Sequence, residues 1–437
     1  MIKVAKFGGS SVANQEQFSK VKNIVEEDPS RRIVVVSAAG KRSPDDHKIT
    51  DLLYLCHAHL QYGVSCAEIF QTIRQRFLEL KAELGVSYDI EVDLDRIEAR
   101  LDRDLSVDEL VSRGEYLTGR LMAEYLGFVF IDAADCIFFG ADGKIDSEKT
   151  CEAVSAAFHQ YNRILIPGFY GALPNGRIKV MTRGGSDITG ALAAAAVGAS
   201  VYENWTDVSG IKMADPKIVN DPRPISKMTY AELRELSYMG ASVLHEESIA
   251  PVRDKGIVLN IRNTNYPQDP GTLIVPSGGD EQGGGRFLTG VAGRRDFSII
   301  TVNKHDTSDS LTLRKALEIL DRYHAHVEHI TLGLDSFAFV ISSKALGDAI
   351  FDVVTDLHKV CQPDDIKVQD GIALIAAVGR RMSFRPGISG QLFKALGEHG
   401  VNIRTLAQGA DELAIIIGVD NKHYDTAIRV MYDEFAG

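Results

Sequence analysis

The stretch Lys3-Val-Ala-Lys-Phe-Gly-Gly-Ser-Ser11 joins a short apolar run to a pair of glycines. The apolar run predicts a strand over residues 3–7, and the residues after Ser11 have the apolar spacing of a helix. Glycines at a strand–helix turn let backbone N–H groups approach phosphate oxygens, and Lys6 would lie beside them. The stretch is not a Walker A loop, because no Gly-Lys-Ser/Thr follows. A plain tight connection is therefore the alternative to a phosphate cradle.

The same alternation of strand and helix patterns continues to about residue 275. Further strands are predicted at 33–36, 128–132, 163–166, 201–205 and 257–262. Continuous apolar strands separated by helices predict an α/β fold with a mostly parallel sheet sandwiched by helices. In such sheets, ligands bind beyond the carboxyl ends of the strands.

A glycine-rich stretch separates this region from a C-terminal part that repeats itself. Residues 276–286 hold five glycines and two acidic residues, which predicts a linker over 278–286. Beyond it the order strand, helix, strand, strand occurs twice, with the first strand predicted at 298–302, and the segments that begin at His326 and Gly400 align. We therefore predict an α/β domain over 1–277, followed by two ferredoxin-like βαββαβ modules over 287–366 and 367–437.

Length, charge and cysteine usage exclude several classes of protein. The chain has 437 residues, whereas single cores stop growing at about 250–300 residues. Its 48 Lys and Arg against 60 Asp and Glu give a net charge of −12, so we expect no nucleic-acid partner and no anionic membrane partner. Five cysteines without a C-x-x-C pair, and no apolar stretch of membrane length, predict a soluble cytoplasmic protein.

More candidate residues fall at predicted strand ends and helix starts. Thr182-Arg-Gly-Gly-Ser-Asp187 is a second glycine turn, in which Arg183 has the planar fork that binds a carboxylate or phosphate. The others are Ser37, Thr50, Ser112-Arg-Gly-Glu115 and Trp205-Thr-Asp-Val-Ser-Gly-Ile211. Helix capping, as for Thr50, or an interaction with the helix dipole is the alternative for several of them. Together they suit phosphoryl transfer by positioning and electrostatics.

In order and spacing these motifs resemble those of the aspartokinases, which belong to the amino-acid kinase superfamily and carry tandem ACT domains. The matching motifs are KFGGSS, VVVSAAG, ITDLL, SRGE, TRGGSD and WTDVSGI with ADPK, and they cover essentially the whole chain. The resemblance implies transfer of the γ-phosphate of MgATP to the β-carboxylate of L-aspartate, the first step of lysine, threonine and methionine biosynthesis. It implies no protein metal site, since Mg²⁺ would be carried by ATP.

The resemblance also implies a role for each matching residue. Lys6 and Asp187 are the expected catalytic residues: Lys6 would neutralise the phosphoryl charge, and Asp187 would orient that lysine or the metal shell. The expected substrate contacts are Ser37, Thr50, Glu115, Arg183, Gly184, Gly185 and Ser186, with Arg183 on the α-carboxylate. The expected nucleotide contacts are Lys6, Phe7, Gly8, Gly9, Thr206, Asp207, Lys212, Lys217, Ser242 and Val243.

Two positions depart from the family pattern. Where the family reads G-A-K-V-L-H-P, this chain reads Gly240-Ala-Ser-Val-Leu-His-Glu246, so Ser242 replaces the lysine expected beside the nucleotide. Lys212 stands where an aromatic residue is usual, and Lys212 or Lys217 could replace the missing charge. Two alternatives stay open: another amino-acid kinase, acting on acetylglutamate, glutamate or carbamate, and a non-catalytic amino-acid sensor of the same fold.

The C-terminal modules contain no catalytic motif, and the resemblance implies that they carry feedback regulation. Lysine is the first candidate effector and threonine the second. The effector would meet the loop 305–310 and the strand 327–331, around Val327 and His329, with Asp306 or Asp309 as partner for a lysine ammonium. Because ACT modules of this family pair across subunits, we expect a homodimer or a larger homo-oligomer.

Overall fold

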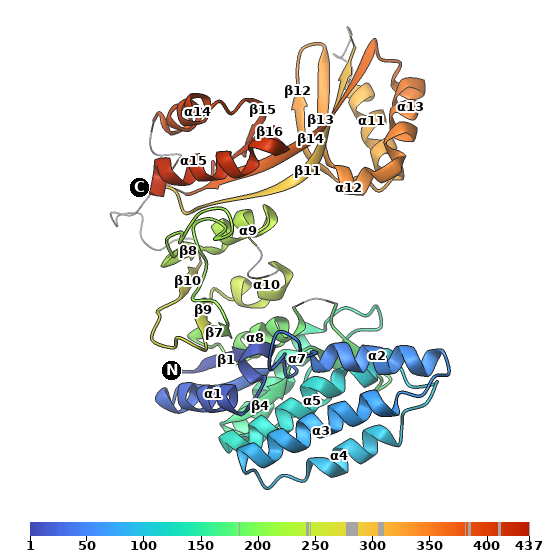
Figure 1. The fold of residues 1–437 in the computed structure, drawn as a ribbon, viewed down its shortest axis with the longest axis vertical. Helices are drawn as coiled ribbons and strands as arrows, with labels where there is room; N and C mark the ends of the chain where they lie inside the picture. Colours follow the sequence, from blue (N-terminus) through green and yellow to red (C-terminus); the bar gives the residue numbers. More distant parts are fainter. Residues whose placement is uncertain are drawn as a thin grey trace. The chain divides into compact units, whose positions relative to one another are not determined.

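The structure is a computed structural model that describes the chain apart from residues 183, 242, 243, 245, 277–286, 305–309, 381, 383–385, 410, 411 and 437. The predicted linker at 278–286 thus lies outside the described residues. The chain divides into two compact units (Figure 1). The first consists of Met1–Ile211, Pro224–Tyr230 and Val243–Glu281, and the second of Lys212–Arg223, Ala231–Ser242 and Gln282–Gly437.

The first unit is built on a sheet of strand order β3-β4-β2-β1-β7-β9-β10-β8. Its strands are β1 (Lys3–Phe7), β2 (Arg31–Val36), β3 (Val129–Phe130), β4 (Ile164–Pro167), β7 (Val201–Thr206), β8 (Lys227–Thr229), β9 (Val258–Asn263) and β10 (Thr272–Val275). From β3 to β9 all neighbours are parallel, and only β10 runs antiparallel to β9. The prediction of a mostly parallel α/β sheet is confirmed.

Helices cover this sheet, as Figure 1 shows. They are η1 (Gly9–Val12), α1 (Gln15–Glu27), α2 (Ile49–Gln61), α3 (Ala67–Leu84), α4 (Ile90–Glu98), α5 (Val107–Leu126), α6 (Ala133–Cys136), α7 (Ser147–Tyr161), α8 (Gly185–Ala196) and α10 (Glu246–Asp254), with a hairpin of β5 (Tyr170–Ala172) and β6 (Ile178–Val180). Side-chain oxygens cap several of these helices; for example, Asn14 accepts from Gln17 N before α1, and Ser106 accepts from Glu109 N before α5. Such caps satisfy backbone donors that have no partner inside the helix.

The alternative interpretation of Thr50 as a helix N-cap is wrong by two residues, and its predicted role as a substrate contact stays a prediction. Helix α2 begins at Ile49, and Lys48 occupies the N-cap position without a side-chain hydrogen bond. Ile49 is fully buried, and its backbone N–H donates to Ala39 O at 3.3 Å. Packing of this apolar residue therefore sets the helix start, rather than a polar cap.

The second unit contains one antiparallel sheet of order β12-β13-β11-β14-β16-β15. Its strands are β11 (Gly290–Asn303), β12 (Val327–Leu332), β13 (Ser336–Ser342), β14 (Asp365–Val378), β15 (Ile403–Gln408) and β16 (Ala414–Asp420). Its helices are α11 (Ser310–Arg322), α12 (Ser343–Leu346), η2 (Gly347–Ala349), α13 (Ile350–Cys361), α14 (Ile388–Glu398), η4 (Asn421–His423) and α15 (Tyr424–Ala436), together with most of α9 (Tyr230–Tyr238). The predicted ferredoxin-like modules are confirmed.

The two modules share their long central strands. The first part of β11, up to Arg294, pairs with the second half of β14, and the part from Phe297 onwards pairs with β13 and with the first half of β14. The sequence predicted only a short strand at 298–302. The structure extends it back to Gly290, where Val291 and Ala292 are buried. The module limits predicted at 287–366 and 367–437 stay predictions.

None of the helices in the described part of the chain has both the length and the apolar character needed to cross a bilayer.

Candidate active site

Three polar side chains meet at the carboxyl end of β1. Lys6 Nζ lies 2.7 Å from Asp187 Oδ1, which comes from the first turn of α8. Because β1 pairs with β7 in parallel register, Asn204 lies opposite Lys6, and its Nδ2 donates to the same Oδ1 at 2.9 Å. Lys6 is 8% exposed and Asn204 4%. An ammonium held this far out of water acts strongly on a nearby phosphoryl charge.

The sequence identified Lys6 and Asp187 but missed Asn204. A polar Glu203–Asn204 pair inside an otherwise apolar strand was the available signal. Asn204 contacts Asp187, whose backbone O also accepts from Tyr202 OH at 3.0 Å. Among the described residues, Asp187 Oδ2 has no hydrogen-bond partner, so it is available to a ligand or a metal ion.

The first glycine turn brings two backbone segments unusually close. Gly40 N donates to Gly9 O at 2.9 Å, and a Cβ on Gly40 would lie 2.6 Å from the same oxygen. By contrast, a Cβ on Gly8 would lie 3.6 Å from Lys6 Nζ, an ordinary van der Waals distance. Gly9 and Gly40 are therefore required by packing, whereas Gly8 borders the space around Lys6.

Phe7 differs from its neighbours in this turn. Its side chain is fully buried and stacks on Trp205, with ring centroids 6.0 Å apart. Its backbone O accepts from Ser37 N at 3.1 Å. A nucleotide contact by Phe7 would therefore have to come from its backbone.

The second glycine turn forms the N-terminus of α8. Gly184 has φ +59 at the N-cap, a conformation that favours glycine, and a Cβ there would collide with Ser248 Oγ. No side chain of the described residues caps this helix, so Ser186 and Asp187 do not act as its caps. The free N–H groups of Gly185 and Ser186 lie at the positive end of the helix dipole, which favours an anion. Arg183, next to this turn, lies outside the described residues.

Glu115 is a buried carboxyl group without a full set of partners. It lies on α5, is 5% exposed, and its Oε2 has no hydrogen-bond partner in the part of the chain that the structure describes. Burial raises the pKa of Glu115 to about 8, against smaller lowering effects from backbone hydrogen bonds and from Arg113. A carboxyl group in this setting is stabilised as an anion only when a cation joins it.

The other predicted substrate and nucleotide residues of the first unit stand at strand ends and at the start of a helix. Ser37 follows β2 and Thr50 is the second residue of α2, and both are half-buried. Thr206 ends β7, and its Oγ1 donates to Asp207 Oδ1 at 3.1 Å. Asn263 Nδ2 donates to Asp207 O at 3.2 Å, which fixes this strand end.

The remaining predicted residues belong to the second unit or lie outside the described residues. Lys212 and Lys217 belong to the second unit, where Lys212 Nζ lies 3.5 Å from Asp221 Oδ1 and Lys217 N donates to Asp215 Oδ1. Ser242 and Val243 lie outside the described residues, and so do Asp306 and Asp309. The roles predicted for these residues stay predictions.

The predicted effector strand is β12, at one edge of the antiparallel sheet. Val327 lies opposite Ile341 of β13. Burial lowers the pKa of His329, and its Nε2 has no hydrogen-bond partner among the described residues. His329 therefore has one buried ring nitrogen without a partner in that part of the chain.

Comparison with known proteins gives one consistent answer. A model of the amino acid kinase family matches residues 1–263, and a model of the ACT domain matches residues 375–435. The chain is 32% identical to aspartokinase 3 of Bacillus subtilis, over 99% of this chain and 98% of that protein. It is 28% identical to lysine-sensitive aspartokinase 3 of Escherichia coli, again over 99% and 98%.

Comparison with solved structures also finds aspartate kinases. The crystal structure of Clostridium acetobutylicum aspartate kinase has a TM-score of 0.91 and 44% identity, and each chain is covered to 99%. Escherichia coli aspartokinase III, solved with aspartate and ADP and also with lysine and aspartate, has a TM-score of 0.76 and 26% identity over both whole chains.

Proposed function

This chain belongs to the amino acid kinase family and is an aspartate kinase with regulatory ACT modules, and we propose how its residues divide the reaction. ATP donates its γ-phosphoryl group to the β-carboxylate of L-aspartate, which gives 4-phospho-L-aspartate. The observation that carries the assignment of roles is the cluster of Lys6, Asp187 and Asn204 between two glycine turns.

The reaction brings two anions together, so charge neutralisation is the main task of the site. Lys6 would contact the transferring phosphoryl group, while Asp187 and Asn204 hold its ammonium in place. Backbone N–H groups after Gly8 and at the start of α8 would line the phosphates. Mg²⁺ carried by ATP would be held by the phosphates and by Asp187 Oδ2, and it would neutralise further negative charge.

The substrate would be oriented by two charges of opposite sign. Glu115 is the proposed partner of the α-ammonium, because a buried carboxyl group with an unpartnered oxygen needs a cation. Arg183 is the proposed partner of the α-carboxylate, with a bidentate geometry that lysine cannot reproduce. Ser37, Thr50 and Ser186 would complete the pocket with hydroxyl groups, next to the backbone of Gly184 and Gly185.

The nucleotide would follow the carboxyl end of β7. Thr206 and Asp207 are its proposed contacts there, together with Val243. Lys212 or Lys217 would supply the positive charge that Ser242 lacks.

We also propose lysine as the feedback effector and threonine as the second candidate. The Escherichia coli relative is lysine-sensitive and was solved with lysine bound in its T-state. In this chain the effector would bind at β12, around Val327 and His329, with Asp306 or Asp309 near its ammonium. A homodimer or larger homo-oligomer through the ACT modules belongs to the same proposal.

A cytoplasmic location is proposed for the enzyme. Cys56, Cys66, Cys136, Cys151 and Cys361 are all free thiols. Unpaired cysteines are typical of a reducing compartment.

A substrate panel tests the proposal directly. ADP release and hydroxamate formation are measured with L-aspartate, L-glutamate and N-acetyl-L-glutamate, each with ATP and Mg²⁺. We expect product only with L-aspartate. Turnover of another acid would favour a different amino-acid kinase, and binding without turnover would favour an amino-acid sensor.

A further inference from the structure

A buried arginine on α3 supports the loop between β2 and α2. Arg76 is 6% exposed. Its Nη1 donates to His47 O at 2.6 Å, and its Nη2 donates to Gly40 O at 2.7 Å. Hydrogen bonds from a charged donor are roughly twice as strong as neutral ones. One guanidinium group therefore holds both ends of the segment 40–47.

The charge of Arg76 is balanced within the same loop. Asp46 Oδ2 lies 3.6 Å from Arg76 Nη1 and accepts from Arg42 N at 3.0 Å and from Arg42 Nε at 3.1 Å. Burial acts to raise the pKa of Asp46, but the hydrogen bonds from Arg42 outweigh it and hold that pKa at about 2. The Asp46 carboxylate that balances Arg76 thus stays ionised at neutral pH.

The clamped loop is connected to the phosphate turn. Gly40, whose carbonyl binds Arg76, donates its N–H to Gly9 O at 2.9 Å. The preceding residue is fixed as well, since Ala39 N donates to Thr118 Oγ1 at 3.1 Å. Ser37 and Thr50, two proposed substrate contacts, flank the loop. A displacement of Gly40 would therefore reach both the nucleotide side and the aspartate side of the site.

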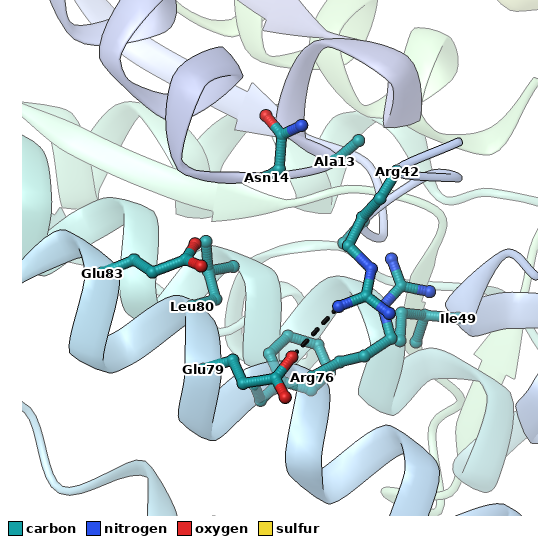
Figure 2. Close-up of a pocket in the computed structure, with 10 residues that line it drawn as sticks. Ala13, Asn14, Arg42, Ile49, Arg76, Glu79, Leu80 and Glu83 are labelled. Carbon is teal, nitrogen blue, oxygen red and sulfur yellow. Dashed lines mark hydrogen bonds and ion pairs between the residues drawn. The ribbon is translucent and has the colours of Figure 1, made fainter. Parts of the chain in front are cut away.

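Apolar packing alone does not hold this loop. A cavity of about 110 Å³ lies beside the guanidinium group and is lined by residues of α3, of the loop and of the turn before α1. Figure 2 shows Arg42 and Arg76 beside this cavity, with Arg42 Nη1 bound to Glu79 Oε2 at 3.1 Å. Because unfilled volume lies next to Arg76, the loop 40–47 would have room to move without the hydrogen bonds that Arg76 donates to it.

We propose that Arg76 is a positioning residue for phosphoryl transfer. By holding the carbonyl groups of Gly40 and His47, it keeps Gly40 against Gly9 and so fixes the first glycine turn. The inference rests on the proposed function, because that function gives the turn its role as phosphate cradle.

The test compares Arg76→Ala and Arg76→Lys with a matched control on the same helix. Arg74 binds Asp95 and Glu98 of α4 at 2.6 Å each and makes no hydrogen bond to the loop in the described part of the chain. We expect Arg76→Ala to lower kcat by about tenfold to a hundredfold and to weaken ADP binding in calorimetry. Arg76→Lys can reach only one carbonyl, so its kcat and its ADP affinity should lie between those of Arg76→Ala and those of the unaltered enzyme. Arg74→Ala should lose thermal stability but keep kcat within about twofold.

Chemical rescue separates positioning from stability. Methylguanidinium at millimolar concentration can enter the space that Arg76→Ala opens next to the cavity, and it should recover part of kcat there and not in Arg74→Ala. If Arg76→Ala and Arg74→Ala have equal kcat and equal ADP affinity, the inference is wrong. If Arg76→Ala does not fold, unchanged kcat in Arg76→Lys overturns it in the same way. ADP binding keeps this test separate from the proposed function, which fails only if the unaltered chain does not turn over aspartate.

Discussion

The parallel sheet of the first unit and the antiparallel sheet of the second place their polar residues in different ways. Strands β1 and β2 are largely buried along their length, and Lys6, the proposed catalytic lysine, stands near the carboxyl end of β1. In contrast, the edge strands β12 and β15 have no fully buried residue, and exposed positions such as Leu406 lie along them.

The difference between the two sheets follows from how helices cover them. A sheet with helices on both faces can bind a ligand only beyond its strand ends. An antiparallel sheet keeps open edges, whose unpaired backbone groups can accept a ligand or another strand. Catalysis is therefore expected at the ends of the first sheet and regulation at the edges of the second.

The largest effect is expected at the carboxyl end of β1. Lys6→Ala removes the charge that stabilises the transferring phosphoryl group, so kcat should fall about a hundredfold to a thousandfold. Lys3 is the matched control, because it stands at the amino end of the same strand and binds Asp28 at 2.8 Å. Lys3→Ala should keep kcat within about twofold. If Lys6→Ala and Lys3→Ala lose the same kcat in the coupled ADP assay, the carboxyl end of β1 has no special role in catalysis.

A smaller loss is expected when Asp187 loses its amide partner. Asn204→Leu keeps the side-chain volume but removes a hydrogen bond to a charged group, which corresponds to about a tenfold to hundredfold loss in kcat. Asn421→Leu in the second unit removes a similar bond, from Nδ2 to Asp296 Oδ1 at 2.7 Å. That control should leave kcat unchanged. An unaltered rate in Asn204→Leu would show that Lys6 holds Asp187 without help.

The strand-end polar residues also show what the sequence could and could not predict. The strands were predictable, because the strand predicted at 201–205 coincides with β7 within a residue. Asn204 was missed because its role depends on the register of β1 against β7, which are about two hundred positions apart in the chain. Periodicity within a strand carries no information about the residue that lies opposite.

The same limit applies to Arg76 and to β11. An arginine in an amphipathic helix has the pattern of a solvent-exposed residue, and only the fold shows that it is buried beneath a loop. The glycines of β11 weaken its strand signal before residue 298. Pairing with β14 makes the longer strand favourable. This pairing requires a glycine at position 293, because a Cβ there would collide with Leu374 O.

A pH dependence is expected from the buried carboxyl group of Glu115. Its pKa is about 8 in the folded chain, against an ordinary value of 4.5. Between these values the folded state binds a proton that the unfolded state has released. The free energy of unfolding should therefore decrease as pH rises from 5 to 8. Glu115→Gln should lack this slope when thermal midpoints of the two proteins are compared at each pH.

The same ionisation should affect substrate binding. Only the charged carboxylate attracts an ammonium, so the KM for aspartate should fall as pH rises from 6.5 to 8.5. A KM that is flat over this range would mean that Glu115 does not bind the substrate amine.

The smallest effect is expected at the edge of the antiparallel sheet. Lysine should inhibit the enzyme, and His329→Gln should raise the lysine concentration for half inhibition by about threefold to tenfold, as for the loss of one hydrogen bond. Titration of lysine and threonine into the kinase assay measures this. If neither amino acid changes the rate, β12 is not an effector site, and the ACT modules would act in subunit pairing alone.

The most direct test of the site is a double-mutant cycle on its central ion pair, which joins Lys6 Nζ and Asp187 Oδ1 at 2.7 Å. Lys6→Met, Asp187→Asn and the double variant are compared by kcat for 4-phospho-L-aspartate formation. Residues that act as one unit are strongly non-additive. We expect the double variant to lose about as much kcat as the more damaged single variant. Losses that multiply would contradict a shared role and would mean that Lys6 and Asp187 act independently.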